Sequence, residues 1–178
     1  MSKKYEYKLV VIEDGEEVLS KPLSYDAVAS IISNAGDSED NEDLFTLAAS
    51  HASSAVRENV AYKDHIPDSV VKMLSTDKSI GVLRNLVRSQ KYKEHASLDE
   101  LEKLISLDIE IAQSIAGDVE SYSEADTNKL STIVASHPDP SVVASLAGNY
   151  SAPKKILKAL LNHADPYVVS EAKRRLED

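Results

Sequence analysis

Residues 137–176 contain one helical unit followed by the start of a second copy of the same unit. Asp139-Pro140 and Asp165-Pro166 each combine a carboxylate that can cap free backbone N–H groups with a proline at the first helical position, where the missing N–H costs nothing. The apolar stripe that follows the first pair consists of Val142, Val143, Leu146 and Ala147. A helix start that recurs with its apolar stripe predicts a helical repeat array.

A second helix completes the unit. Gly148-Asn149 can adopt the left-handed conformation that ends a helix, and Pro153 begins the next helix. The apolar stripe of this partner helix is Ile156, Leu157, Leu160 and Leu161. Each unit is therefore predicted to be two helices joined by a turn.

Comparison of the chain with itself extends the repetition toward the N-terminus. At an offset of 86 residues, identical residues occur at Leu44, Thr46, Ala49, Ser50, His51, Val56, Ala61, Pro67, Lys72, Leu74, Val82 and Arg88. Apolar markers of successive first helices are Val56, Val82, Ile111, Val142 and Val168, with spacings of 26, 29, 31 and 26 residues. This pattern predicts an all-α solenoid of about four repeats over residues 44–178.

The chain resembles the leucine-rich repeat variant family, a HEAT-like group of bacterial tandem repeats of two helices. The family's Asp-Pro, Ala-x-Asn and downstream Pro before a Leu-rich helix are matched by Asp139-Pro140, Ala147-Gly148-Asn149, Pro153, Leu157 and Leu160. Val56-Arg57 matches the family's Val-Arg step, whereas Val143 replaces the arginine in the later copy. The resemblance covers residues 44–178 and implies a right-handed α-α superhelix. Some members carry an iron–sulfur module, which needs cysteine thiolates, and this chain has no cysteine, so no cofactor is expected.

Composition and charge narrow the class of protein. The sequence is 42% hydrophobic and lacks both a secretory apolar segment and an 18-residue apolar run, so we expect a cytoplasmic protein. The formal charge is -10, and residues 1–43 hold 4 Lys against 11 Asp and Glu, which leaves 16 Lys and Arg against 19 acids in the repeats. Because positive and negative charges are nearly balanced in the repeats, we do not expect a general binder of nucleic acid or of an anionic membrane.

The first 43 residues differ from the repeats. Alternating apolar residues over Tyr5–Ile12 and the Asp14-Gly15 turn predict a β-hairpin, and Ser24 is placed to cap a helix whose apolar stripe is Val28, Ile31 and Ile32. Because a two-stranded hairpin is marginal alone, residues 1–35 are predicted to cap the first repeat. The acidic run over residues 36–43 is expected to be a solvated linker, and it lacks the glycine and glutamate that a calcium loop requires.

The five histidines are the first place to look for chemistry. His51, His137 and His163 recur at the turn between helices, which favours a role in turn structure or capping over metal binding or general base catalysis. No histidine pair has the spacing of a helical zinc site, and the sequence contains neither a Gly-rich phosphate loop nor a Gly-x-Ser-x-Gly elbow. We expect no catalytic and no metal-ligating residues.

Charged residues off the apolar stripes are the candidates for binding. The arginines of the first helices are expected either to pair with an acid of the next repeat or to bind a carboxylate or phosphate. The second helices change from acidic to basic along the chain, as expected of either a solvated face or a polarised protein-binding groove. The candidate binding residues are Arg57, Arg84, Arg88, Asp99, Glu100, Glu102, Asp126, Lys154, Lys155 and Lys158.

These observations predict a non-catalytic scaffold that binds another protein, as a monomer or a weak homodimer. One alternative is a nucleic-acid enzyme, because some HEAT-like glycosylases excise alkylated bases in a basic groove with aromatic side chains. Against it, the repeats are slightly acidic and tryptophan is absent. A second alternative is a structural protein that self-assembles through the hairpin edge or through stacked repeat ends.

Overall fold

A computed structural model describes residues 5–177 of the chain. Helices make up 61% of the structure. Within the described residues there are twelve α-helices, two short 3-10 helices and one two-stranded antiparallel hairpin. The chain divides into two compact units between Ser89 and Gln90. The prediction of a mainly helical protein with a small N-terminal hairpin is confirmed.

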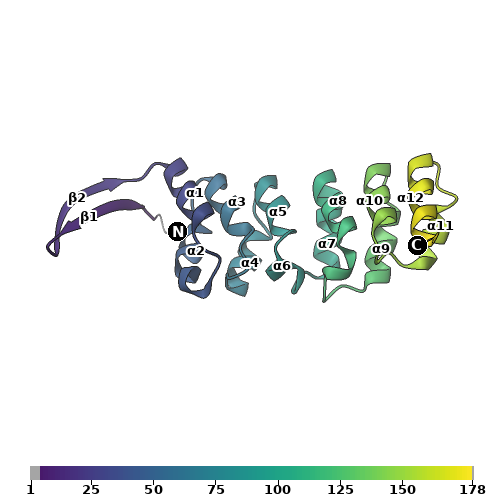
Figure 1. The fold of residues 1–178 in the computed structure, drawn as a ribbon, viewed down its shortest axis with the longest axis horizontal. Helices are drawn as coiled ribbons and strands as arrows, with labels where there is room; N and C mark the ends of the chain where they lie inside the picture. Colours follow the sequence, from purple (N-terminus) through teal and green to yellow (C-terminus); the bar gives the residue numbers. More distant parts are fainter. Residues whose placement is uncertain (1–4, 178) are drawn as a thin grey trace. The chain divides into compact units, whose positions relative to one another are not determined.

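The first unit contains the hairpin and five α-helices. Its elements are β1 (Lys8–Glu13), β2 (Glu16–Pro22), α1 (Tyr25–Asn34), the 3-10 helix η1 (Glu39–Asn41), α2 (Glu42–Ala48), α3 (Ser54–Ala61), α4 (Asp68–Leu74) and α5 (Ile80–Leu86). Helices α1, α3 and α5 pack one beside the next (Figure 1), and α2 and α4 contact their neighbours in this row. The fully buried side chains of this unit include Ile32, Phe45, Val56, Leu74 and Leu86.

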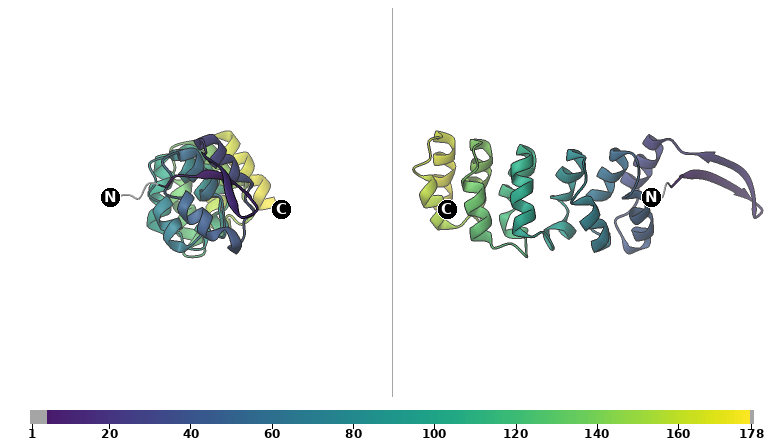
Figure 2. Two further views of the ribbon diagram at one scale, coloured as in Figure 1. Left: turned by 90° about the vertical axis from the view of Figure 1, so that its left-hand side faces the viewer. Right: turned by 180° about the vertical axis from the view of Figure 1, so that it is seen from behind.

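The second unit has two layers of helices. Its elements are α6 (Gln90–Lys93), α7 (Leu98–Leu107), α8 (Ile109–Gly117), the 3-10 helix η2 (Val119–Ser121), α9 (Thr127–Ala135), α10 (Pro140–Gly148), α11 (Lys154–Leu160) and α12 (Pro166–Glu177). Helices α8, α10 and α12 form one layer, and α7, α9 and α11 form the other, as the two opposite views show (Figures 1 and 2). Within residues 5–177, no helix is both long enough and apolar enough to cross a membrane.

The expected helix starts are confirmed by their hydrogen bonds. The Asp139 carboxylate accepts from the backbone N–H of Ser141 at 2.8 Å, and Asp165 accepts from Tyr167 at 2.8 Å. Ser97 and Glu100 form a capping box at the start of α7. These caps satisfy N–H groups that a helix cannot pair internally, so the local sequence determines where these helices begin.

A polar side chain links each first helix to the preceding one within its unit. The donors and accepting backbone carbonyls are Asn59 to Ala29 (3.1 Å), Asn85 to Glu58 (2.9 Å), Asn149 to Gly117 (2.8 Å) and Arg175 to Gly148 (3.0 Å). The two residues of each pair are separated by 30, 27, 32 and 27 positions. We call this recurring set the helix ladder. It has the period of the sequence repeat.

The hairpin forms as predicted, but its expected packing is wrong. Asp14 and Gly15 adopt positive φ values of 50° and 87°, as a two-residue hairpin turn requires. All residues of β1 and β2 are nevertheless exposed, and the hairpin extends away from the helices of its unit (Figure 1). Helix α1 packs against α3 and buries Val28 and Ile32, and Tyr7, just before β1, contacts the ring of His51 at 5.4 Å between ring centroids.

Three further expectations need correction. Ile31, expected on the buried stripe of α1, is 48% exposed because the next residue, Ile32, occupies the core. The acidic segment 36–43 is mostly exposed, as expected, but it is not a plain linker: it forms η1 and the start of α2, and the Asp37 carboxylate accepts from the N–H groups of Asp64 and His65. Gly148 and Asn149, expected to end a helix in the left-handed conformation, do not have positive φ, and Asn149 ends α10 in an extended conformation with φ -70° and ψ 133°.

Candidate binding groove

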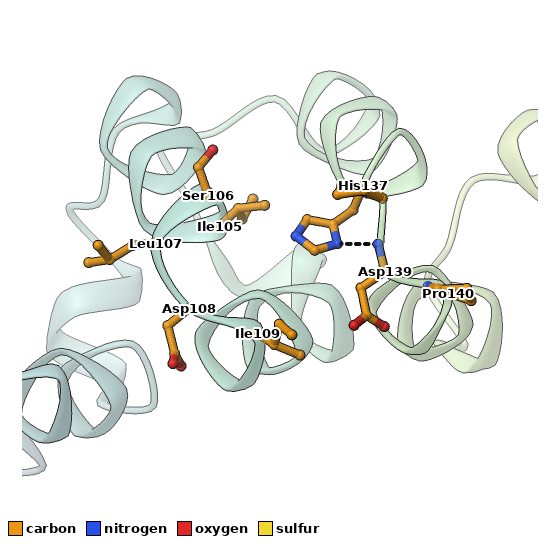
Figure 3. Close-up of a pocket in the computed structure, with 9 residues that line it drawn as sticks. Ile105, Ser106, Leu107, Asp108, Ile109, His137, Asp139 and Pro140 are labelled. Carbon is orange, nitrogen blue, oxygen red and sulfur yellow. Dashed lines mark hydrogen bonds between the residues drawn. The ribbon is translucent and has the colours of Figure 1, made fainter.

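The recurring histidines serve the turns that precede first helices. In each case the Nδ1 atom accepts the backbone N–H two residues later, at 3.0 Å for His51 and 3.1 Å for both His137 and His163. Figure 3 shows the bond from Asp139 to His137. This confirms the predicted turn role. Among residues 5–177, no group of three or more His, Cys, Asp and Glu side chains could hold a metal ion.

Arg57 is tied to the turn before the next first helix. Its Nε and Nη2 atoms donate to the two carboxylate oxygens of Asp77 at 2.7 and 2.9 Å, and Nη1 donates to the backbone carbonyl of His51 at 2.8 Å. The hydrogen bonds from Arg57 lower the pKa of the Asp77 carboxyl below its usual value. Of the two expected roles, Arg57 therefore has the pairing with an acid, and that acid lies just before α5. Arg84 is half-buried on α5, and Arg88 is exposed just beyond it.

The charged candidates of the second helices lie in one layer of the second unit. Helix α9 contacts both α7 and α11, so the acids of α7 and the lysines of α11 stand at opposite ends of this layer. Glu100 bonds to Ser97, and Asp126 accepts from the N–H of Lys129 at 2.9 Å, so both acids are engaged in helix caps. The remaining candidates are exposed: Asp99, Glu102, Lys154, Lys155 and Lys158.

A groove of ≈ 620 Å³ crosses the other layer of the second unit, over α8, α10 and α12. Its lining residues are Gln113, Pro140, Ser141, Ala144, Ser145, Gly148, Asp165, Tyr167 and Glu171. We call it the first-helix groove. Small residues on α10 at positions 141, 144, 145 and 148 form a helical stripe, which leaves room between the larger side chains of α8 and α12.

The groove is polar and ordered by its own hydrogen bonds. Gln113 donates from Nε2 to the Ser141 hydroxyl at 2.8 Å, and that hydroxyl donates to Asp139 at 2.6 Å. On the opposite wall Glu171 pairs with Arg174 at 2.5 Å, and the Tyr167 side chain is 65% exposed. The lining includes two carboxylates and neither lysine nor arginine. Such a surface can accept hydrogen bonds and attract positive charge.

The sequence interpretation missed this groove. It followed the apolar stripe of 140–148, which faces the core, and gave no weight to the small-residue stripe on the other side of the same helix. The spacing of Ser141, Ala144, Ser145 and Gly148 was the available signal. The same signal also occurs at ordinary helix contacts, so only the neighbouring helices reveal a groove.

A second hollow of ≈ 470 Å³ lies at the turns before α8 and α10 (Figure 3). Leu107 and Ile109, on its rim, are 54% and 48% exposed. The two carboxylates of this hollow cap helices: Asp108 accepts from Ile111 at 3.1 Å, and Asp139 accepts from Ser141. Hydrogen bonds from the Ser141 hydroxyl and backbone lower the pKa of Asp139. Because both carboxylates are occupied by helix caps, the exposed side chains of Leu107 and Ile109 are the part of this hollow that can contact an apolar group.

No protein-family model, no curated protein and no solved structure matches the chain.

Proposed function

We propose that the chain is a HEAT-like array of helix pairs, wound as a right-handed superhelix, and that it acts as a non-catalytic scaffold for binding another protein. The helix ladder supports the array, because its donor-to-acceptor separations match the period of the sequence repeat. In such arrays each repeat contacts only its neighbours, and the row of helices offers an extended binding surface.

The binding proposal rests mainly on the first-helix groove. Its small-residue floor can admit an extended segment, and its hydroxyl and amide groups can bond to a peptide backbone. Asp165 caps α12 and Glu171 pairs with Arg174, but the groove lining itself holds these two carboxylates and no cation, which favours a segment that carries lysine or arginine. The exposed ring of Tyr167 adds a flat apolar contact of the kind enriched at protein interfaces.

A peptide-display selection against the full-length chain tests this proposal. We expect selected peptides to contain basic residues and to lose affinity at least about tenfold when Ser145→Trp fills the groove, since that corresponds to about 1.4 kcal/mol of binding free energy. Thr132→Trp places the same bulk on the exposed face of α9 and serves as the control. Equal binding of the peptides to wild type and Ser145→Trp would exclude the groove as the site.

The nucleic-acid alternative has less support. A groove that binds nucleic acid needs cations for the phosphates and aromatic rings for the bases. The lining of the first-helix groove instead includes two carboxylates and neither lysine nor arginine. A fluorescence anisotropy titration with duplex DNA measures this directly. Tight binding that weakens with salt would favour the nucleic-acid enzyme and direct mutagenesis to Arg84 and Arg88.

A further inference from the structure

The hairpin exposes apolar side chains on both of its faces. Leu9, Val10, Val11, Ile12, Val18 and Leu19 are 51%, 43%, 42%, 65%, 55% and 39% exposed. A hairpin of two strands is marginally stable in water, and it gains stability when further strands extend the sheet. Its strand edges are therefore the part of this unit that most lacks a partner.

The two edges of the hairpin are not equivalent. On β2 the pairing register shifts opposite Val11 and Ile12, so Val18 forms a bulge, and Pro22 lacks a backbone N–H. Bulges and prolines are features that block the addition of another strand. Strand β1 contains no proline, and the register shift between Val11 and Ile12 places the extra residue on β2 rather than on β1. The open edge is that of β1.

The backbone groups on the β1 edge can be assigned. The carbonyl of Tyr7 accepts the N–H of Leu23 at 2.8 Å, so Tyr7 directs its backbone groups toward the other strand. Because antiparallel strands alternate in this respect, Lys8, Val10 and Ile12 direct theirs outward. These outward residues can pair with an equivalent set from another chain.

Charge is polarised along the hairpin. Lys8 and Lys21 lie at its open end, and Glu13, Asp14, Glu16 and Glu17 lie at or beside its turn. Lys8 contacts Glu6 at 3.2 Å, but both side chains are about half exposed or more, and exposed ion pairs contribute little. A second hairpin that ran in the opposite direction would bring its acidic turn to Lys8. A parallel hairpin would instead bring the two acidic turns together.

We propose that two copies of this chain associate through β1, antiparallel, to form a four-stranded sheet in the order β2-β1-β1-β2. The two β1 strands would be related by a two-fold axis perpendicular to the sheet, and this axis must pair the outward residues of one copy with the outward residues of the other. The axis can therefore pass beside Val10, which pairs Val10 with Val10, or beside Val11, which pairs Val10 with Ile12. The Val11 centre places Lys8 opposite Asp14 of the second copy, and the Val10 centre places the two as diagonal neighbours. The interface is small, so we expect a dissociation constant on the order of micromolar.

Analytical ultracentrifugation of the full chain over a concentration series tests this dimer. Val10→Pro removes an outward N–H of β1 without removing a bond to β2, and Ser20→Pro, at the paired position of β2, blocks the other edge in the same way. We expect at least a tenfold increase in the dissociation constant for Val10→Pro and little change for Ser20→Pro. Far-UV circular dichroism checks that the helices are unchanged in both variants.

Charge variants provide a second test. Asp14→Asn keeps a turn that Asn-Gly favours but removes the acid expected to face Lys8, so it should weaken the dimer and reduce its sensitivity to salt. Lys21→Gln removes one unit charge of the opposite sign on β2, away from the proposed interface, and should have little effect. A wild-type chain that stays monomeric at several hundred micromolar, or loss of the dimer in both proline variants, would overturn the assignment to the β1 edge.

Discussion

Arg57 and Asp77 form a two-pronged ion pair, with N–O distances of 2.7 and 2.9 Å and side chains that are 17% and 9% exposed. Asp77 also accepts the N–H of Ser79 at 2.8 Å, just before α5. Because α3 packs against α5, the pair holds the turn between α4 and α5 against α3. Arg57 therefore has a structural role, because its Nε, Nη1 and Nη2 atoms already donate hydrogen bonds within the chain.

Asp77→Ala should lower the free energy of unfolding of the first unit by about 1–3 kcal/mol, because it leaves a half-buried guanidinium and a helix N–H without their acceptor. Urea denaturation followed by circular dichroism measures this change. Arg88→Ala removes an exposed arginine and should change the free energy by less than about 0.5 kcal/mol. Equal effects of the two substitutions would contradict a stabilising role for the Arg57 pair.

The first unit should lose stability as the pH falls below 6.5. Burial lowers the pKa of His51 from its usual 6.5, and the nearby Arg57 acts in the same direction. The unfolded chain then binds more protons than the folded chain between the folded pKa and 6.5, so stability is present above 6.5 and is lost on acidification. Thermal melts at pH 7.5, 6.5 and 5.5 should show a falling midpoint.

His51→Asn is the matched variant for the pH measurement. An asparagine can supply the same turn bond, since Asn149 accepts the N–H of Ser151 at 2.7 Å in the equivalent way. The variant should keep the turn while its melting temperature falls less between pH 7.5 and 5.5. An unchanged pH dependence would assign the acid sensitivity to other groups.

Two neighbouring isoleucines of α1 should contribute very different amounts to the free energy of unfolding. Ile32 is fully buried, so Ile32→Ala should lower the free energy of unfolding by about 2–5 kcal/mol. Ile31 is 48% exposed, and Ile31→Ala should cost less than about 1 kcal/mol because little area leaves the core. Chemical denaturation of both variants tests whether α1, rather than the hairpin, covers the first unit.

Gly117→Ala should stabilise the second unit by about 0.5–1 kcal/mol, because a Cβ there meets nothing within 4 Å and alanine restricts the unfolded chain. Gly148→Ala should gain less or lose stability, since its Cβ would lie 3.3 Å from a carboxylate oxygen of Glu171. The melting temperatures of the two variants provide the comparison. A larger gain for Gly148→Ala would contradict the close approach of α12 to α10.

Local sequence was sufficient for the hairpin turn and for many helix ends. Asp14-Gly15 specified the turn because few other residues adopt its positive φ values. Asp139-Pro140 specified the start of α10 because the cap and the proline act within one turn. The turn role of His137 could also be inferred, since it recurs in register with His51 and His163.

Other features depended on tertiary contacts. The apolar alternation of β1 predicted a strand but not its exposure, because burial depends on whether another element reaches it. The adjacent residues Ile31 and Ile32 both fit an apolar stripe, and only the position of α3 decides which is buried. The first-helix groove exists because α8 and α12 bring larger side chains to either side of the small stripe on α10. The sequence alone determined the helix pairs, their period and the turn chemistry, which act over a few residues. Packing between segments about 30 residues apart decided which faces are buried, which are hollow and which are left exposed.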